Sequence, residues 1–379
     1  MNNTQEINFF DCSRSNEDSE KLLELFQSGN IASGKEVSIL ENNLKDYFQC
    51  DDAITFSDMT SAIFSLFKAI EIGQDDEVLC SSYNCLSSTS AISLVGAKAV
   101  WVDLCNDYPS MSIEDCKSKI TSKTKAILLY HIAGYPSDIE EFRTLCEDRD
   151  IILIEDLNNS FGATWNSKLV GSVGDFTILS FYPNRQISSI EGAAILVKNK
   201  ASSNRLKALR KYGIEQDSFR NSIGEINPDS DVKKSSFNFS LSNVHACLVN
   251  QSIKNHTQRI NSVIQNAAFL NKELCESDKI SIVKVPDNIK PVYWGFFIKA
   301  LNSIEIIKSL KNEKIHATKL HFPNHHYSIF KSSKPSEGSL INTQKFYNEV
   351  ICLPCGWWLD INDMTRVVHV MKKLITSIN

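Results

Sequence analysis

The sequence contains no apolar run that approaches the roughly 20 residues needed to cross a bilayer. No stretch is rich in Lys and Arg, and the formal net charge of −5 gives no reason to expect nucleic acid as a partner. The first residues are polar and acidic and lack the basic and apolar segments of a signal peptide. We therefore expect a cytoplasmic protein, without membrane contact, whose partners are small molecules or a second copy of itself.

The cysteines form no disulfide framework, because the eleven of them are scattered singly along the chain. One pair, Cys352 and Cys355, has the CxxC spacing of redox and zinc sites. The surrounding letters EVICLPCGWW are typical of a buried strand that runs into a turn, and no second ligand pair follows. We expect a structural role for the pair and no metal site.

Short apolar runs alternate with helical stretches from about residue 53 to residue 200. Strands that are buried on both faces and alternate with helices indicate an α/β fold, with a mainly parallel sheet flanked by helices. Farther along, residues 215–235 form a polar surface loop, and residues 242–275 read as one long helix that a break could interrupt. The predicted division is a large α/β domain of residues 1–250 and a small C-terminal α+β domain of residues 251–379.

Ligands of such sheets sit at the carboxyl ends of the strands. Five polar clusters, far apart in the sequence, follow predicted strands and are therefore expected to converge at one edge. They are Ser57–Thr60, Ser82–Cys85, His131, Asp156–Asn159 and Ser180–Arg185.

Taken singly, each cluster allows two interpretations. The turn at Ser57–Thr60 could hold a phosphate at a helix N-terminus, with Ser180 as a further donor, or could simply cap the helix through Asp58 or Thr60. Asp156 could hold a protonated pyridine nitrogen, or could serve as a cap or ion-pair partner. His131 is more often structural than catalytic in such a position. Arg185 is either a surface ion-pair residue or an anion-binding group.

In this order, the clusters resemble the DegT/StrS family of nucleotide-sugar aminotransferases, which depend on pyridoxal phosphate (PLP). The similarity runs over roughly residues 20–370. The segments that carry it are ITFSDMTSAI, DEVLCSSYNCLSSTSAISLVGAKAVWVDL, KTKAILLYHIAGYPSDI and IEDLNNSFGATWNSKLVGSVGDFTILSF. The resemblance implies an aspartate-aminotransferase-like fold whose large domain binds the cofactor.

The resemblance also implies roles for individual residues. Asp156 would bind the pyridine nitrogen, and Asn159 would lie beside the ring hydroxyl. Thr60, the Met59 amide and Ser180 would bind the cofactor phosphate. In SFNFSLSNVHACLVNQ, Asn238 would reach a phosphate in the neighbouring subunit, which implies a homodimer with shared sites.

One departure from the family changes the expected chemistry. The family's Schiff-base lysine follows its Ser by five residues, and SFYPNR places Arg185 there. Arginine stays protonated, and its guanidinium forms no stable imine with PLP. Lys168 and Lys198 are no obvious substitutes. The aromatic residue that commonly stacks on the cofactor ring corresponds to Cys85, with Tyr83 near enough to replace it.

We therefore expect a protein that acts on a nucleotide-linked keto-deoxysugar in surface polysaccharide or sugar biosynthesis, but not by lysine-based transamination. It would hold PLP or pyridoxamine phosphate (PMP) non-covalently and act like the family's dehydratases. Its base would be His131 or a histidine of HFPNHHY, although that segment reads as a solvated loop. One alternative is a non-catalytic sugar-nucleotide-binding or partner subunit. Another is an engineered substitution at Arg185 in an ordinary aminotransferase.

Overall fold

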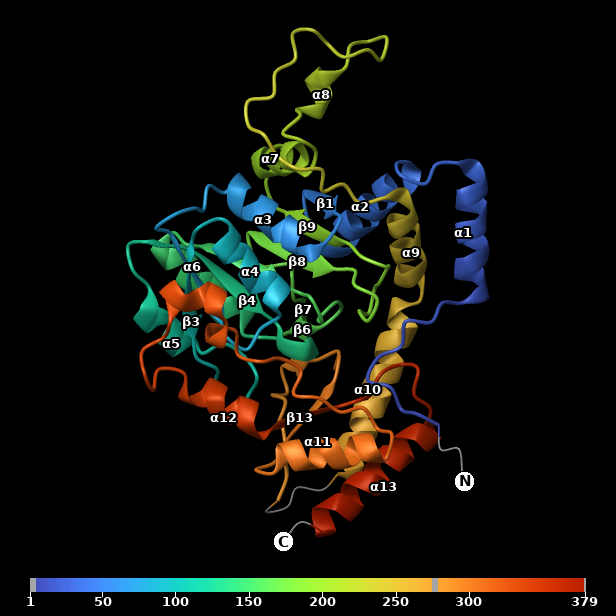
Figure 1. Cartoon of the computed structure of the whole chain (residues 1–379), viewed down its shortest axis with the longest axis vertical. Coiled ribbons are helices and arrows are strands. Elements are labelled where there is room, and N and C mark those ends of the chain that lie inside the picture. The colour runs from blue at the N-terminus through green and yellow to red at the C-terminus, as the bar shows by residue number, and fades with distance from the viewer. Residues whose placement is uncertain (1–4, 275–278, 378–379) are drawn as a thin grey trace.

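The computed structural model describes residues 5–274 and 279–377, and its main feature is a seven-stranded sheet (Figure 1). The strands lie in the order β1-β9-β8-β5-β4-β2-β3. β4 pairs in parallel with β5 and β2, β5 with β8, and β2 with β3, whereas β9 is antiparallel to both of its neighbours. The seven strands are β1 (Asp52–Phe56), β2 (Glu77–Ser81), β3 (Lys98–Val102), β4 (Thr124–Tyr130), β5 (Ile152–Asp156), β8 (Phe176–Ser180) and β9 (Ala193–Val197).

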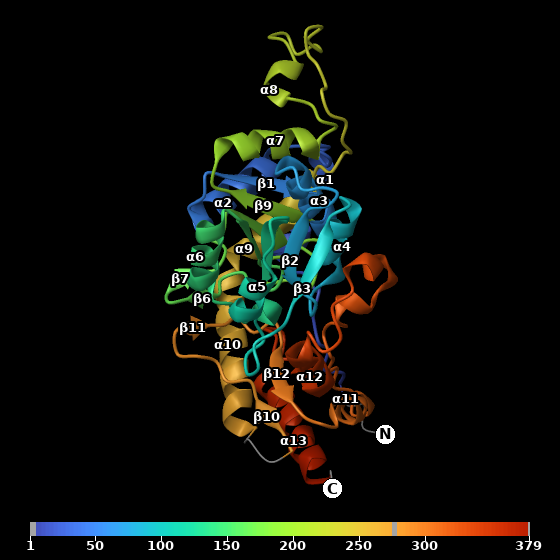
Figure 2. The ribbon, with the colours of Figure 1, turned by 90° about the vertical axis from the view of Figure 1, so that its left-hand side faces the viewer.

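Helices cover both faces of this sheet, as Figure 2 shows for α4 and α6 on opposite sides of it. Consecutive residues of the central strands alternate between two cores, so Ile127 and Leu153 face one layer while Leu128 and Ile154 face the other. The predicted α/β fold with a mainly parallel sheet is thus confirmed. The helices of this part are α1 (Asn16–Ser28), α2 (Lys35–Phe48), α3 (Met59–Ala69), α4 (Leu86–Leu94), α5 (Ile113–Lys119), α6 (Ile139–Arg149), α7 (Lys200–Arg210), α8 (Gln216–Phe219) and α9 (Asn243–Lys254).

The C-terminal part packs below the large sheet in Figure 1 and has its own core. The predicted long helix is broken at Asn255 into α9 and α10, so the expected domain boundary at residue 250 falls inside α9 and stays a proposal about folding units. Near the N-terminus, Ile7 pairs with Ile315 and is buried in this C-terminal core. The elements are α10 (His256–Glu273), β10 (Ser281–Ile282), β12 (Phe296–Lys299), α11 (Ser303–Asn312), α12 (Ile341–Glu349), β13 (Val350–Leu353) and α13 (Ile361–Ser377).

Smaller elements complete the fold. A three-stranded sheet joins the two parts, because β11 of the C-terminal half pairs with β6 of the N-terminal half. Three short 3₁₀ segments lie at Ile132–Gly134, Asn324–His326 and Ser328–Ser333. The minor strands are β6 (Thr164–Trp165), β7 (Lys168–Leu169) and β11 (Ile289–Lys290).

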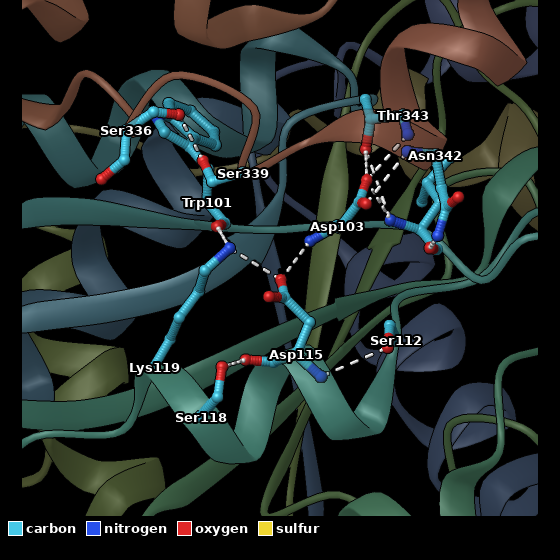
Figure 3. Close-up of polar contacts among 11 residues, drawn as sticks. Trp101, Asp103, Ser112, Asp115, Ser118, Lys119, Ser336, Ser339, Asn342 and Thr343 are labelled. Carbon is cyan, nitrogen blue, oxygen red and sulfur yellow. Dashed lines mark hydrogen bonds and ion pairs between the residues drawn. The ribbon is translucent and has the colours of Figure 1, made fainter.

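One buried carboxylate links the end of β3 to α12 (Figure 3). Asp103 Oδ1 accepts from the Thr343 amide at 2.7 Å and from Thr343 Oγ1 at 2.7 Å, and Oδ2 accepts from the Asn342 amide at 3.0 Å. These amides belong to the first turn of α12, which would otherwise lack partners. Asp103 therefore acts as an N-cap supplied by another element, and it fixes α12 against the large sheet.

Residues 211–240 form an arm that stands away from the rest of the molecule at the top of Figures 1 and 2. The arm includes residues 215–235, which the sequence predicts to be a surface loop, and most of its described side chains are exposed. Ile223, Ile226 and Phe237 are large apolar side chains among them. None of the described helices is both long and apolar enough to cross a membrane.

Cys352 and Cys355 are buried, and Cys352 lies in β13. No described cysteine forms a disulfide, and the described residues contain no group of three or more side chains that could hold a metal ion.

Candidate functional site

The strand-end clusters converge as the topology predicts. β1, β2, β4, β5 and β8 all run in the same direction, so their carboxyl ends share one edge of the sheet. Hydrogen bonds then join residues that follow different strands. Ser88 Oγ donates to Asp156 Oδ2 at 2.7 Å, and Arg185 Nε donates to Asn158 Oδ1 at 2.6 Å. We call these side chains, with Tyr130, Asn159, Cys85 and His321, the strand-end cluster.

Asp156 is fully buried at the end of β5. Its carboxylate accepts one hydrogen bond at each oxygen, from Ser88 Oγ and from the Asn158 amide at 2.9 Å. Burial raises its pKa to about 6, against the lowering effect of these bonds and of the nearby charges. A carboxylate can accept about four hydrogen bonds, so Asp156 has room for a further donor.

The neighbouring Glu155 points to a different set of partners. Its two oxygens accept from the amides of Gly171, Val173 and Gly174 and from His131 Nε2 at 3.2 Å. His131 Nδ1 accepts from the Ser137 amide at 3.0 Å, so the hydrogen must be placed on Nε2. Both ring nitrogens of His131 are therefore engaged away from Asp156, and this geometry favours a structural role over the catalytic one predicted.

Arg185 is buried in the loop after β8, where its guanidinium forms hydrogen bonds with neutral groups. Nε donates to Asn158 Oδ1, and Nη1 donates to Asn184 Oδ1 at 2.5 Å. The guanidinium carbon lies 5.4 Å from the Trp294 ring centroid and 5.8 Å from that of Tyr182. Burial lowers the pKa of Arg185, which remains protonated at neutral pH.

A chain of side-chain hydrogen bonds runs from Asn159 to the C-terminal part. Asn159 Nδ2 donates to Tyr130 Oη at 2.8 Å, so the Tyr130 hydroxyl is left to donate to His321 Nε2 at 3.1 Å. Burial, and secondarily the charge of Arg185, lowers the pKa of His321 to about 3. His321 is therefore a neutral imidazole inside the strand-end cluster.

The histidines of HFPNHHY are thus not all solvated, as the sequence suggested. His321 packs edge-on against the rings of Tyr83 and Tyr130, and His325 Nδ1 lies 2.6 Å from Ser82 Oγ. Only His326 is exposed. The prediction failed because the contacts that bury this segment come from residues more than 190 positions away in the sequence.

The turn before α3 combines the two interpretations that the sequence left open. Asp58 caps α3, with its Oδ1 accepting from the Ser61 amide at 2.8 Å. The amides of Met59 and Thr60 lie in the same first turn, and no hydrogen bond from them is formed within the described residues. Thr60 Oγ1 donates to the Ser87 carbonyl, and Ser180 is buried at the end of β8.

The other predicted residues have varied positions. Cys85 is the N-cap residue of α4, and its Sγ lies 3.0 Å from Ser87 Oγ. The ring of Tyr83 is fully buried, and its hydroxyl donates to the Lys319 carbonyl. Asn238 is exposed at the base of the arm.

The lysines considered as substitutes lie outside the cluster. Lys168 Nζ contacts Glu140 on the surface, and Lys198 Nζ donates to the Val173 carbonyl. Lys319 lies nearer, since its carbonyl accepts from Tyr83. Its Nζ is directed instead to the carbonyls of Tyr347 and Asn348 at the C-terminal end of α12.

Sequence reasoning missed three members of the cluster and its surroundings, namely Ser88, Tyr130 and Trp294, and it gave no role to Asn158 within the predicted cluster Asp156–Asn159. Tyr130 carried a signal, because it is the last residue of a strand that precedes a singled-out His131. Trp294 carried none, because it reaches Arg185 from a distant loop of the C-terminal half.

Comparisons with known proteins place this site in a family. The profile of the DegT/DnrJ/EryC1/StrS aminotransferase family matches residues 13–372. The protein MJ1066 of Methanocaldococcus jannaschii is 26% identical over 369 residues, which is 95% of each chain. GDP-perosamine synthase of Escherichia coli O157:H7 is 32% identical over 183 residues, covering 48% of this chain and 50% of that protein.

Among solved structures, the sugar aminotransferase Spr1654 from Streptococcus pneumoniae, in its PLP form, superimposes with a TM-score of 0.89. The match covers 98% of this chain and 99% of that one, at 18% identity, and therefore establishes a shared fold. The family match extends over nearly the whole length, as the sequence motifs indicated. The chain belongs to the DegT/DnrJ/EryC1/StrS aminotransferase family.

Proposed function

We propose that the strand-end cluster binds PLP or PMP non-covalently and that the protein acts on a nucleotide-linked keto-deoxysugar, without a Schiff-base lysine. The observation that carries this proposal is that the site keeps the acid Asp156, although the lysine of the family is replaced by Arg185. Asp156 is buried and has a free acceptor position, while Arg185 stands where the family has its lysine. The names of the sugar aminotransferase Spr1654 and of GDP-perosamine synthase support the substrate class.

The residues present fit the cofactor in three of four places. Asp156 would hold the ring nitrogen, and its high pKa suits a carboxyl that waits for a cationic N–H donor. The Met59 and Thr60 amides, with Ser180, would hold the phosphate at the N-terminus of α3. Asn159 Oδ1 is buried without a partner and would accept from the ring hydroxyl. The fourth place, the covalent link, has no described lysine among its contacts.

When bound, the cofactor supplies a ring that withdraws electrons from the substrate. The chain's own residues then have to orient the ring and move a proton. Asp156 would keep the ring nitrogen protonated, whereas His321 is a weak base, because its Nε2 accepts from Tyr130 Oη and burial lowers its pKa to about 3. Both ring nitrogens of His131 are engaged elsewhere, so we assign the proton-transfer role to neither histidine.

A non-catalytic binding subunit is the second candidate. It is favoured by the hydrogen bonds that hold Arg185 to Asn158 and Asn184, because these bonds fill the position of the family's amine.

In either case, we propose a homodimer in which the arm of residues 211–240 and Asn238 approach the partner's site. The exposed apolar residues of the arm support such an assembly.

Absorption spectroscopy of the purified protein with added PLP tests the proposal. We expect PLP to remain bound through gel filtration, and borohydride reduction to label no lysine. A reduced, labelled lysine would overturn the claim that the site works without a Schiff base. Loss of all cofactor on gel filtration would favour the binding subunit.

The variant Arg185→Lys provides the complementary experiment. If the rest of the site is intact, it should gain an imine absorption band with PLP and a lysine that borohydride labels. Glutamate-dependent amination of a keto-sugar nucleotide can then be assayed in that variant. An Arg185→Lys protein that binds PLP but forms no imine would show that more than the amine has been lost.

A further inference from the structure

Arg185 is a buried cation whose partners are all neutral. Its guanidinium donates to the amide oxygens of Asn158 and Asn184, and it lies near the rings of Tyr182 and Trp294. No carboxylate oxygen of the described residues lies within 4.0 Å of the guanidinium nitrogens of Arg185. A buried charge is unfavourable unless an opposite charge and hydrogen bonds compensate for it. Asp156 and Glu191 act on the guanidinium only from beyond ion-pair distance, so it keeps hydrogen-bonding capacity for an anion that comes from outside the chain.

A second donor lies beside the guanidinium. Asn158 Nδ2 is buried and has no hydrogen-bond partner, while Oδ1 of the same carboxamide is held by Arg185 Nε. This bond fixes the orientation of the amide, so that its N–H₂ group is the end left for a ligand. A guanidinium next to an amide N–H₂ offers two donors to the two oxygens of one anion.

An unpartnered acceptor follows in the chain. Asn159 Oδ1 is buried without a partner, while its Nδ2 donates to Tyr130 Oη. An acceptor near an anion-binding pair suits a ligand hydroxyl group. When PLP is bound, the same atom could instead face the cofactor's hydroxyl, so this observation supports but does not carry the inference.

The surrounding charges favour an anion of low charge. Asp156 and Glu191 both interact electrostatically with Arg185, so two carboxylates already share the field of one cation. A phosphate dianion would meet more repulsion here than a carboxylate, which carries a single charge. The flat, two-oxygen geometry of a carboxylate also matches a guanidinium and an amide side by side.

We propose that Arg185 and Asn158 form a receptor for a carboxylate of the substrate, and that the substrate is a sugar acid. Asn159 Oδ1 can accept two hydrogen bonds, so a hydroxyl group of a sugar acid can share it with the cofactor, whereas a simple keto acid brings no hydroxyl group. This inference rests on the proposed function only in taking the strand-end cluster as the ligand site.

Binding of small probes to the full-length protein tests the receptor. The probes are D-glucuronate, the neutral D-glucose, pyruvate as a keto acid, and inorganic phosphate, titrated by calorimetry with and without added PLP. We expect saturable binding of D-glucuronate, weaker binding of pyruvate, and no binding of D-glucose. Phosphate competing equally with D-glucuronate would overturn the choice of a carboxylate, and so would the absence of any carboxylate binding.

Two variants assign the binding to these residues. Arg185→Gln should weaken D-glucuronate binding by at least about tenfold, as expected for a lost charged hydrogen bond. Arg205→Gln removes an exposed arginine from α7 and should leave binding unchanged. Unchanged binding in Arg185→Gln would refute the proposal.

Asn158→Asp gives a result that a merely structural role would not. It places a carboxylate beside the guanidinium, so it should raise the melting temperature and abolish D-glucuronate binding together. A lower melting temperature with binding retained would contradict the inference, even if Arg185→Gln fails to fold. Retention of PLP is read separately by its absorbance, so failure of the cofactor proposal is distinguished from failure of the receptor.

Discussion

Two adjacent acids at the end of β5 show how single residues divide stability from function. Both Glu155 and Asp156 are fully buried, yet their pKa values move in opposite directions. Burial raises both values, but only Glu155 has enough donors around it to reverse the effect. Glu155 is therefore satisfied by the protein alone, whereas Asp156 is under-satisfied, as expected of a group that awaits a ligand.

Replacing Asp156 should consequently stabilise the cofactor-free protein. Because its folded pKa of about 6 exceeds the ordinary 3.8, ionised Asp156 costs stability as the pH rises through that interval. The cost at pH 7 is at most about 3 kcal/mol, from about 1.4 kcal/mol per pKa unit. Asp156→Asn should raise the free energy of unfolding by up to that amount at pH 7 and change it little near pH 4. Urea denaturation at both pH values measures the difference. The same variant should lose PLP, and a stabilised variant that keeps full PLP affinity would contradict the assignment.

At the scale of elements, Glu155 is the anchor of the segment that leads from β7 to β8. Its oxygens accept from the amides of Gly171, Val173 and Gly174, and this holds the turn against the sheet. His131 completes the arrangement from the end of β4. The hydrogen bonds of Glu155 therefore connect β5 with the end of β4 and with the segment before β8.

Glu155→Gln should be strongly destabilising at neutral pH. Burial raises the Glu155 pKa, but the bonds from His131, Gly174 and Gly171 bring it below the ordinary 4.5. A lowered pKa contributes stability above pH 4.5 that is lost as the pH falls through the folded pKa. We expect the free energy of unfolding to fall by about 3 kcal/mol at pH 7 and by less at acidic pH. Glu114→Gln, at an exposed position of α5, is the matched control and should cost almost nothing. Equal losses at pH 7 and pH 4 would argue against an ionised Glu155.

Asp103 holds α12 in place as Glu155 holds the turn before β8, by accepting hydrogen bonds from backbone amides. Asp103→Asn should lower the free energy of unfolding by about 1–3 kcal/mol, because one of its two oxygens can no longer accept from the first turn of α12. Hydrogen exchange should also show faster opening of α12 and of the His321 segment before it. Asp107→Asn changes an exposed acid of the following loop and serves as the control. Protection of α12 that is equal in both variants would refute the capping role.

The elements themselves were largely predictable from the sequence, and the reasons are local. Asp58, Ser112 and Asp138 cap the helices that the patterns placed after them, and apolar runs such as Ile152–Asp156 form the buried strands. The common edge of the strand ends followed from the parallel topology. The position of His321 did not, because it depends on contacts with Tyr83 and Tyr130 from the other half of the chain. The orientation of the His131 ring could not be predicted from the sequence either, because its hydrogen bonds with Glu155 and Ser137 determine it.

For the molecule as a whole, the arm of residues 211–240 is the feature that a single chain does not explain. It projects from the body in both views (Figures 1 and 2). Several of its large apolar side chains are exposed. Exposed apolar groups gathered on one projecting segment are typical of an interface. The cavity of about 1280 Å³ between the arm and the helices α2, α3 and α7 leaves room for a segment of another chain. The proposed homodimer would account for both features.

The arm makes this assembly testable with a matched pair of substitutions. Ile223 in the arm is 80% exposed, and Leu301 in the C-terminal part is 85% exposed. An aspartate at either position should leave the monomer fold intact, because neither side chain belongs to a core. If the arm covers a second copy, Ile223→Asp must bury a charge at the interface and should shift the dimer toward monomer in light scattering, whereas Leu301→Asp should not. A shift of at least about tenfold in the dissociation constant is expected for one buried charge.

If both variants stay dimeric, the arm is not the interface. If Asn238 also serves the partner's phosphate, the Ile223→Asp monomer should release PLP, and this loss would tie assembly to the site.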